Sequence, residues 1–358
     1  MKNKKVVIWN TGIDNLIAGQ GAVGGLTVQL YFWAKTFVSR GWKVYSFSSN
    51  KRCSLGGIHF LYSRKYRFVD IVCKPFSCLY LLLCIRPEII VCRGADRSLF
   101  WIALFAKIVR AKCLFFGASD VNFVIGKDTL VGNKINTLLY RRSLSFVSHI
   151  IVQNEVQKKT LLANYNRESL VIPNIWLNKP KESDKIKVYD VLWVANMRRL
   201  KRPEWFISLA KEMPDYKFAM VGGITLGDRD YFLQVKKMAE GIDNLHFCGA
   251  MPFAEVNSLF SKVKILVCTS EYEGFPNTFL QAWSNGVPVV STVDPNHLIS
   301  SRSLGYFIQT EKELHSRVDL LLKDISIYEA QSDKIKEYFE QSHSAANAFN
   351  LLMSYMKR

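Results

Sequence analysis

The feature that most constrains the fold of this 358-residue chain is the alternation of short apolar segments with longer segments that have helical spacing. Short apolar runs are typical of buried strands, and strands that alternate with helices predict parallel sheets built from β-α-β units. In the first half the expected strands are 5–9, 44–47, 88–92, 112–116, 150–152 and 170–173. A helix is expected over 25–39, because apolar residues recur at helical spacing from Leu26 to Phe37.

The same alternation restarts after a polar stretch at 178–184, which is the best candidate for a linker. The expected strands of the second half are 190–195, 217–221, 244–247, 265–268 and 288–291. A helix is expected from Pro203, since proline suits the first helical position, and a last helix over 345–355. The sequence therefore predicts an α/β protein with one doubly wound domain at 1–176, a second at 177–342 and a C-terminal helical segment at 343–358.

The net charge of +18 is placed unevenly along the chain. Residues 1–176 hold 25 lysines and arginines against 8 aspartates and glutamates, a balance of +17, whereas the remaining residues hold 23 against 22. An excess confined to one half predicts an anionic partner for that half. No motif of a nucleic-acid-binding module is recognisable, so a nucleic acid is not expected to be that partner.

The cysteines and the apolar runs bear on the compartment. None of the eight cysteines forms a Cys-x-x-Cys pair, and most lie inside apolar runs, which predicts buried thiols in a reducing compartment. The apolar run near the N-terminus is too short for a signal peptide, and the longest one, 76–85, is broken by Arg86 and Pro87. We therefore expect a cytoplasmic protein, or one that lies on the inner surface of the cytoplasmic membrane.

The segment that begins at Glu273 predicts a loop that opens a short helix. Gly274 and Pro276 favour a turn, and Asn277 or Thr278 is expected to cap the helix that follows. The free N–H groups of a first helical turn, together with the helix dipole, suit an anion such as a diphosphate. The alternative is an ordinary loop between a strand and a helix, which would need no carboxylate at Glu273.

A second candidate site is the basic loop 196–203, which follows the first strand of the second half. It holds Arg198, Arg199, Lys201 and Arg202 directly before the helix at Pro203. A cation near 4 Å from a phosphate contributes on the order of 4 kcal/mol at intermediate dielectric, so two cations can replace a metal ion. The alternative is a solvated basic loop.

Two glycine or acidic motifs have competing interpretations. Residues 19–24 match the pattern G-x-G-x-x-G of dinucleotide-binding sites. However, Gly19 follows the first strand at too great a distance in the sequence, and the second strand ends without the acidic residue that such sites have. Asp228 and Asp230 match the Asp-x-Asp pattern that holds a metal ion in some glycosyltransferases, yet Asp230 is more simply a helix cap. Neither a dinucleotide cofactor nor a metal site is therefore expected.

Taken together, these motifs resemble those of family-four retaining glycosyltransferases, the glycosyl transferases group 1. The motifs stand in the order of that family: Gly24-Gly25, Pro173-Asn174, Arg198 with Lys201, and then the segment 273–290. The family pattern at the donor sugar is Glu, seven residues, Glu, and here the second position is Gln281. None of the six histidines stands where many relatives have one, after the strand 112–116; a subset has Ser-Asp there, as in Ser119-Asp120.

The resemblance implies a GT-B fold, in which two Rossmann-like doubly wound domains face a cleft and the last helix crosses back to the first domain. It implies transfer of a sugar, with retention, from a UDP- or GDP-sugar to an acceptor hydroxyl, without a metal ion or a bound cofactor. The implied catalytic residues are Glu273, Arg198, Lys201 and Asp120. The implied donor-binding residues are Gly24, Gly25, Gly274, Phe275, Pro276, Asn277, Thr278 and Gln281. Arg198 and Lys201 would hold the diphosphate, Glu273 the sugar and Gln281 the ribose.

The expected acceptor is a lipid-linked glycan of bacterial surface polysaccharide assembly, and the expected surface is an anionic membrane. The segment 60–68 interleaves aromatic and basic residues, and 98–112 suggests an apolar helix that ends in Lys107, Arg110 and Lys112. The competing interpretation is that this helix belongs to the core. Two other functions stay open, a non-catalytic partner of the same fold and a sugar-nucleotide epimerase.

Overall fold

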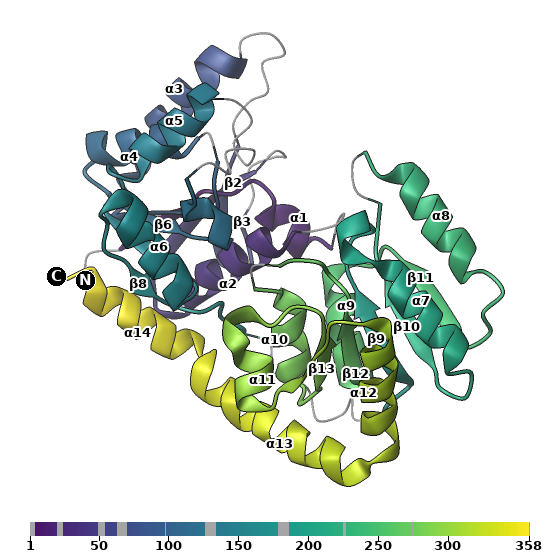
Figure 1. Cartoon of the computed structure of the whole chain (residues 1–358). Helices are drawn as coiled ribbons and strands as arrows, with labels where there is room; N and C mark the ends of the chain where they lie inside the picture. The colour runs from purple at the N-terminus through teal and green to yellow at the C-terminus, as the bar shows by residue number, and fades with distance from the viewer. Residues whose placement is uncertain are drawn as a thin grey trace. The chain divides into compact units, whose positions relative to one another are not determined.

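The computed structural model describes residues 4–19, 24–48, 54–62, 70–96, 98–125, 134–177, 186–224, 227–273 and 275–357, without the side chains of 70–75 and 134. These residues form two compact units (Figure 1). Unit 1 consists of Met1–Ile175 together with Ala345–Arg358, and unit 2 consists of Trp176–Ser344. The linker candidate at 178–184 lies outside the described residues.

Unit 1 is built on an eight-stranded sheet with the order β3-β4-β2-β1-β5-β6-β7-β8. Its strands are β1 Lys5–Ile8, β2 Lys43–Ser48, β3 Ser54–Leu55, β4 Ile58–Tyr62, β5 Ile89–Arg93, β6 Lys112–Phe116, β7 His149–Val152 and β8 Leu170–Val171. All neighbours pair in parallel except β3 and β4, which pair antiparallel. The α/β prediction is confirmed, but β3 and β4 were not predicted.

The helices of unit 1 connect these strands and cover the sheet. They are α1 Ile13–Ile17, α2 Gly25–Ser39, α3 Asp70–Ile85, α4 Leu99–Ile108, α5 Lys134–Ser143, α6 Glu155–Tyr165 and α14 Ala345–Tyr355, with a 3₁₀ turn, η1, at Asp120–Phe123. The predicted bounds of α2 and α14 are those observed. These two helices pack together in unit 1, where the rings of Phe37 and Phe349 lie 5.2 Å apart.

Two predictions about the expected membrane segments are corrected. Phe60 is a buried residue of β4, so it cannot belong to an exposed aromatic stretch, and 63–69 lie outside the described residues. The expected helix 98–112 is shorter, because α4 ends at Ile108 and Arg110 has a left-handed backbone with φ 58°. Lys112 begins β6, and its ammonium donates to the carbonyl oxygen of Met356. Among the helices that the structure describes, none is long and apolar enough to cross a membrane.

Unit 2 contains a fully parallel six-stranded sheet with the order β11-β10-β9-β12-β13-β14. Its strands are β9 Tyr189–Val194, β10 Phe218–Val221, β11 Leu245–Gly249, β12 Val263–Cys268, β13 Val289–Ser291 and β14 Gly305–Phe307. The short edge strand β14 was not predicted. It begins at Gly305, where φ is 137° and a Cβ would lie 1.9 Å from the carbonyl oxygen of Val289, so only glycine fits.

The helices of unit 2 include one further correction. They are α7 Pro203–Glu212, α8 Arg229–Ala239, α9 Phe253–Leu259, α10 Asn277–Trp283, α11 Leu298–Arg302, α12 Glu311–Lys323 and α13 Ile325–Ser342, with 3₁₀ turns η4 Arg199–Lys201, η5 Phe260–Lys262 and η6 Pro295–His297. Helix α7 begins at Pro203 as predicted. Asp230 is not a cap, because α8 starts one residue earlier and Asp228 occupies the capping position.

Both sheets reverse their strand order beside their first strand. In unit 1 the reversal lies between β1 and β5, and in unit 2 it lies between β9 and β12. The loops at the carboxyl ends of two such strands diverge, and open α/β sheets bind their ligands at this topological switch point. Each unit therefore offers one place where a ligand is expected.

Candidate functional site

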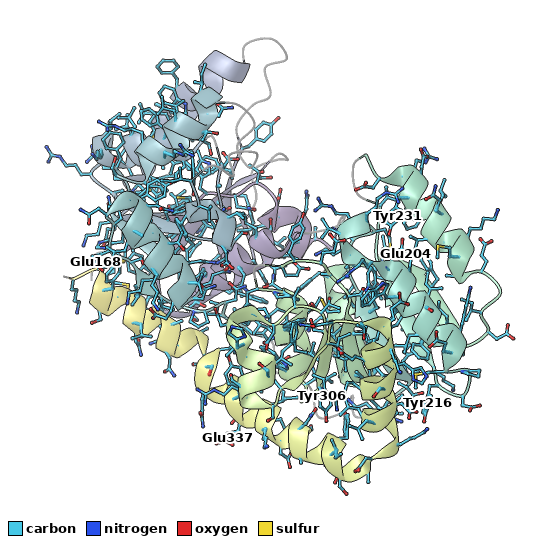
Figure 2. All side chains as sticks on the ribbon, in the orientation of Figure 1. Glu168, Glu204, Tyr216, Tyr231, Tyr306 and Glu337 are labelled. Carbon is cyan, nitrogen blue, oxygen red and sulfur yellow. The ribbon has the colours of Figure 1, made fainter. Side chains whose placement is uncertain are left out.

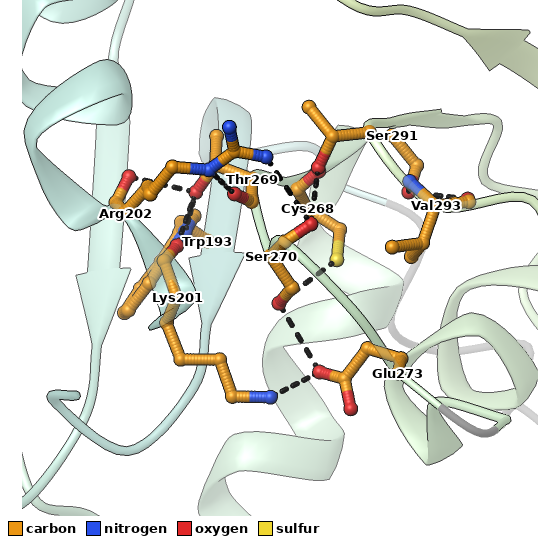
Figure 3. Close-up of polar contacts among 10 residues, drawn as sticks. Trp193, Lys201, Arg202, Cys268, Thr269, Ser270, Glu273, Ser291 and Val293 are labelled. Atoms are coloured by element: carbon orange, nitrogen blue, oxygen red, sulfur yellow. Dashed lines mark hydrogen bonds and ion pairs between the residues drawn. The ribbon is translucent and has the colours of Figure 1, made fainter. Parts of the chain in front are cut away.

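At the switch point of unit 2, the loop after β9 is fastened to the end of β12 (Figure 3). The hydroxyl of Thr269 accepts a hydrogen bond from the indole N–H of Trp193 at 3.0 Å. The same hydroxyl lies 2.6 Å from the carbonyl oxygen of Lys201 and 2.9 Å from that of Arg202. Thr269 is fully buried, so these contacts hold the turn η4 in one position.

Lys201 and Glu273, which are 72 positions apart in the sequence, form an ion pair at this point. The hydroxyl of Ser270 donates to the same carboxylate oxygen of Glu273 at 3.1 Å (Figure 3). The side chains of Lys201 and Glu273 remain 14% and 24% exposed. An ammonium and a carboxylate are thus held together at the edge where a ligand is expected, and both are open to solvent.

The side chain of Arg202 is held in place by contacts within unit 2. Its Nε donates to the carbonyl oxygen of Thr269 at 2.8 Å, and its guanidinium lies 4.4 Å from the ring centre of Trp205. Its backbone is left-handed, with φ 44°, where it precedes α7. These contacts leave the Arg202 side chain little freedom to meet a ligand, in agreement with the prediction that Arg198 and Lys201 hold the diphosphate.

The two remaining arginines of the basic loop differ from each other. The guanidinium of Arg199 lies 4.7 Å from the ring centre of Tyr231, whose hydroxyl donates to Glu204 at 2.6 Å. Figure 2 shows Tyr231 and Glu204 close together on α8 and α7. Arg198 is exposed, and within the described ranges no carboxylate pairs with it. Arg198 and Lys201 are therefore the cations of this loop that a phosphate can reach.

The helix after Glu273 begins differently from the prediction. Asn277 is the first residue of α10, and the capping position belongs to Pro276, with no hydrogen bond from a side chain. Asn277 and Thr278 therefore lie inside the first turn, because the extended backbone of Pro276, with ψ 125°, ends immediately before them. Gly274 lies outside the described residues.

Two predicted donor-binding residues have partners inside unit 2. The ring of Phe275 lies 6.1 Å from Trp283 and 5.9 Å from His343, in an aromatic cluster. Gln281 is 4% exposed, and its amide nitrogen donates to the side-chain oxygen of Asn257 at 3.3 Å. Because Gln281 is almost fully buried, only a small part of its side chain is open to a ribose.

The site contains a thiol, but not an activated one. Cys268 ends β12, and burial raises the pKa of its thiol, with a further increase from the Glu273 carboxylate. The thiol is protonated at neutral pH, so Cys268 is a poor nucleophile. Among the described residues, no group of three or more histidine, cysteine or acidic side chains could hold a metal ion.

The predicted Gly24-Gly25 pair stands at the start of α2 in unit 1. Gly24 occupies the capping position with an ordinary φ of −73°, and a Cβ there would meet no described atom within 4 Å. The described fold therefore gives no reason for a glycine at this position. The next residue, Leu26, reaches the end of β5, since a Cβ on Gly94 would lie 2.7 Å from its Cδ1.

Asp120 belongs to a network of amide side chains in unit 1. Its Oδ1 accepts hydrogen bonds from Gln157 at 2.9 Å and from Asn154 at 3.1 Å. The amide nitrogen of Gln157 also lies 3.2 Å from the Oε1 of Gln153. Asp120 is the first residue of η1 and is half-buried, so the network fixes the direction of its carboxylate.

Sequence reasoning missed Arg93, at the switch point of unit 1. Arg93 ends β5 and is 9% exposed, and its Nη2 donates to Asn174 at 2.6 Å. Gln153 donates to the same Asn174 oxygen at 2.8 Å. Burial lowers the pKa of Arg93 to about 10, so the guanidinium is charged at neutral pH. A signal was present in the sequence, because a charged residue directly follows the apolar run Ile89–Cys92.

No carboxylate among the described residues neutralises Arg93. Its Nε is buried and makes no hydrogen bond. A buried cation without an acidic partner is costly, and such groups are concentrated at functional sites. The switch points of both units thus carry a cation.

Residues 174–340 match the family described as Glycosyl transferases group 1. A curated relative, the O-antigen biosynthesis glycosyltransferase WbnH of Escherichia coli, is 25% identical over 166 residues, which cover 46% of each protein. The chain thus spans about half the length of this relative.

The similarity to solved structures extends over nearly the whole chain, as the following two show. HepE from Anabaena, in complex with UDP and glucose, has a TM-score of 0.77 at 14% identity and covers 99% of each chain. Sucrose-phosphate synthase from Thermosynechococcus elongatus has a TM-score of 0.75 at 14% identity and covers 99% of this chain and 98% of the other. The described chain has the GT-B fold that the sequence predicts, and the match to the group 1 glycosyltransferases covers residues 174–340 of it.

Proposed function

We propose that this chain, whose residues 174–340 match the group 1 glycosyltransferases, moves a sugar with retention from a UDP- or GDP-sugar to a hydroxyl of a lipid-linked glycan. The observation that carries the proposal is the ion pair of Lys201 and Glu273 at the switch point of unit 2. HepE was solved with UDP, and WbnH is named for O-antigen biosynthesis, which supports the choice of donor and acceptor.

In this proposal the cations stabilise the leaving group. Bond cleavage at the sugar places negative charge on the departing diphosphate, and fixed cations near that charge lower the barrier. Lys201 can transfer its contact from Glu273 to a phosphate oxygen, and exposed Arg198 can approach from the same loop. Two cations of this kind supply the role that a metal ion has in other enzymes, so we propose that no metal ion is required.

Glu273 would position the donor sugar. A carboxylate only accepts hydrogen bonds, so it suits the hydroxyl groups of a sugar. When Lys201 turns to the diphosphate, the hydroxyl of Ser270 still holds one oxygen of Glu273 in place. The Cys268 thiol is a poor nucleophile and Glu273 holds the sugar hydroxyls, so retention is assigned to direct attack of the acceptor hydroxyl on the face that the diphosphate leaves. The bond from the sugar to the diphosphate breaks as the new bond forms, and the hydroxyl proton passes to the departing diphosphate oxygen.

We assign the nucleotide sugar to unit 2 and the acceptor to unit 1. Asp120 would contact the acceptor, and Gly24 and Gly25 would let the backbone approach the donor diphosphate. Gln281 would contact the ribose through the amide groups that Asn257 does not engage. Unit 1 carries 27 lysines and arginines against 8 acidic residues, a net charge of +19, whereas unit 2 has 21 against 22. This imbalance favours a place on the anionic inner face of the cytoplasmic membrane for unit 1.

The proposal is tested with a panel of UDP- and GDP-sugars. One donor should raise the melting temperature of the full chain, because a ligand that binds only the folded state stabilises it. The same donor should be hydrolysed slowly in water and transferred to a lipid-linked acceptor, with the anomeric configuration retained in the NMR spectrum of the product. EDTA should leave the rate unchanged.

Three outcomes would contradict the proposal. Failure of every donor to stabilise the chain or to be hydrolysed would indicate a non-catalytic partner of the same fold. Conversion of the donor sugar into its epimer without any acceptor would indicate a sugar-nucleotide epimerase. A product with inverted configuration would overturn the assignment of a retaining mechanism.

A further inference from the structure

Three helices of unit 1, α3, α4 and α5, lie side by side over one face of its sheet (Figure 1). Helix α4 contacts both α3 and α5. The inner sides of the three helices share one core, in which Leu82, Ile102 and Tyr140 are buried. The helices therefore form a single layer, with one side against the sheet and the other side against solvent.

The solvent side of this layer is apolar. Eight large apolar side chains, here called the outer face, are exposed: Phe76, Tyr80 and Leu83 on α3, Trp101, Leu104 and Ile108 on α4, and Ile135 and Leu138 on α5. Within each helix they recur three or four residues apart, which places them on one stripe. Phe76, Ile135 and Leu138 are 69%, 70% and 68% exposed.

Ordinary surface helices do not have this pattern. A helix on the surface of a globular protein is usually polar on the side away from the core. Here α3 and α4 are apolar on both sides, and the helices are neighbours, so their outer stripes adjoin. An apolar surface of this extent marks a place where another body is bound.

Basic residues accompany the outer face at one end of the layer. Because α3, α4 and α5 lead into the parallel strands β5, β6 and β7, they run in the same direction and end at the same edge of the sheet. Arg86 follows α3, Lys107 lies in the last turn of α4, and Arg142 lies in the last turn of α5. All three side chains are exposed. The charge at this end of the layer suits an anionic partner.

We propose that the outer face lies on an anionic phospholipid bilayer, with its apolar side chains at the boundary of headgroups and acyl chains and the basic end against lipid phosphates. Helices that combine apolar, aromatic and basic residues in this way lie in the plane of the interface. Trp101 and Tyr80 are of the types that are enriched at that depth. The net charge of +19 on unit 1 favours a lipid surface over a neutral protein partner or a second copy of this basic chain.

This inference rests on the membrane placement in the proposed function, but not on glycosyl transfer, since none of these residues belongs to unit 2. The test is sedimentation of the full chain with vesicles of phosphatidylcholine alone or with about one-third phosphatidylglycerol. The chain should bind the anionic vesicles, bind the neutral ones far less, and be released by high salt.

A triple variant, Phe76→Ser, Trp101→Ser and Leu138→Ser, removes one exposed anchor from each helix. Its partition onto anionic vesicles should fall more than about tenfold, because several buried methylene groups are lost from the interface. The matched control replaces exposed apolar residues of unit 2, with Ile186→Ser, Leu233→Ser and Ile325→Ser, and should bind like the wild type. A second variant, Lys107→Gln with Arg142→Gln, should mainly weaken the dependence on lipid charge.

Several outcomes would overturn the proposal. They are equal binding of the triple variant and the wild type, an equal loss in the unit 2 control, binding that ignores lipid charge, and a dimer that the triple variant dissolves without any vesicle binding. The shift in melting temperature with a nucleotide sugar, measured on the same variants, separates the two proposals. Docking without donor binding would refute the proposed sugar transfer and leave the membrane face. Donor binding without docking would refute the membrane face and the membrane placement of unit 1, and leave the proposed sugar transfer.

Discussion

The two switch points of this protein hold their cations in different ways. In unit 2, Lys201 is paired with Glu273, and both side chains are partly open to solvent. In unit 1, Arg93 is almost fully buried, and among the described residues it bonds to the amide of Asn174 and to no carboxylate. The first arrangement can exchange its partner for a ligand at little cost. The second keeps a charge in a place where the fold gains little from it.

The energetic difference follows from burial. The side chains of Lys201 and Glu273 are mostly buried but still reach water, and Glu273 also accepts from Ser270, so their charges lose only part of their solvation. A buried charge loses its solvation, and the lowered pKa of Arg93, about 10, reports that loss. Since the folded pKa lies below the unfolded one, the cost is fully present at neutral pH and declines only above pH 10. We therefore expect that loss of the Lys201 charge impairs function without stabilising the fold, whereas loss of the Arg93 charge impairs function and can stabilise the fold.

The largest effect is expected for Lys201→Met. If the ammonium stabilises the departing diphosphate, its removal should lower kcat on the order of 100- to 1000-fold. The melting temperature should fall only modestly, because Glu273 loses its cation but keeps the hydroxyl of Ser270 and some contact with water. Lys264→Met is the matched control, since Lys264 is another partly exposed lysine of unit 2, paired with Asp190 at 2.8 Å. Near-normal transfer by the double variant Arg198→Met with Lys201→Met would exclude the diphosphate clamp.

The second prediction concerns Arg93→Met. Replacing a buried charge by an apolar side chain of similar length is often neutral or stabilising by about 1–4 kcal/mol. The oxygen of Asn174 keeps its bond from Gln153, so no acceptor is orphaned. We expect unchanged or higher stability in urea together with a loss of transfer. A fall of more than about 3 kcal/mol in the free energy of unfolding would show instead that Arg93 is required for the stability of the fold.

A smaller effect is expected for Gln281→Glu. Hydrogen bonds to a charged acceptor are stronger, so a carboxylate should hold the ribose hydroxyls more tightly and lower the donor KM a few-fold, or leave it unchanged. Because Gln281 is buried beside Asn257, stability should fall by about 1 kcal/mol. Loss of all transfer with stability intact would show that the amide has a role that a carboxylate cannot fill.

The smallest effect is expected for Asp120→Asn. The substituted amide keeps an oxygen that can accept from Gln157 and Asn154, so stability should change by less than about 1 kcal/mol. If Asp120 contacts the acceptor, the acceptor KM or kcat should change while the donor KM stays constant. Asp96→Asn, on an exposed residue of the same unit, is the control. A change confined to the donor KM would place Asp120 with the donor instead.

The sequence predicted the layered α/β fold well, because buried parallel strands are continuous apolar runs and helices carry a different period. It did not predict strands β3 and β4, which are short and are separated only by Gly56 and Gly57, or the three-residue strand β14. Lys201 and Glu273 were selected because they match motifs of the family. The ion pair between them could not be predicted, since it depends on the order of strands in the sheet.

Burial explains the other differences. A basic residue at a strand end resembles a solvated one, so Arg93 was overlooked, and the period of a helix does not reveal whether an apolar stripe faces a core or solvent. For this reason the outer face of α3, α4 and α5 could not be separated from their inner sides. Likewise, the sequence of α10 gave no sign that Gln281 would be tied to Asn257 on another helix.

The attachment of η4 through Thr269 has a consequence for how the basic loop can change. The threonine hydroxyl contacts the main-chain oxygens of Lys201 and Arg202, so the attachment does not depend on which side chains the loop carries at 198–201. These two contacts also restrain the backbone of the loop, which lowers the entropy that a bound ligand would have to compensate for. The chemistry of ligand recognition can therefore be varied at 198, 199 and 201 on a backbone that stays constant.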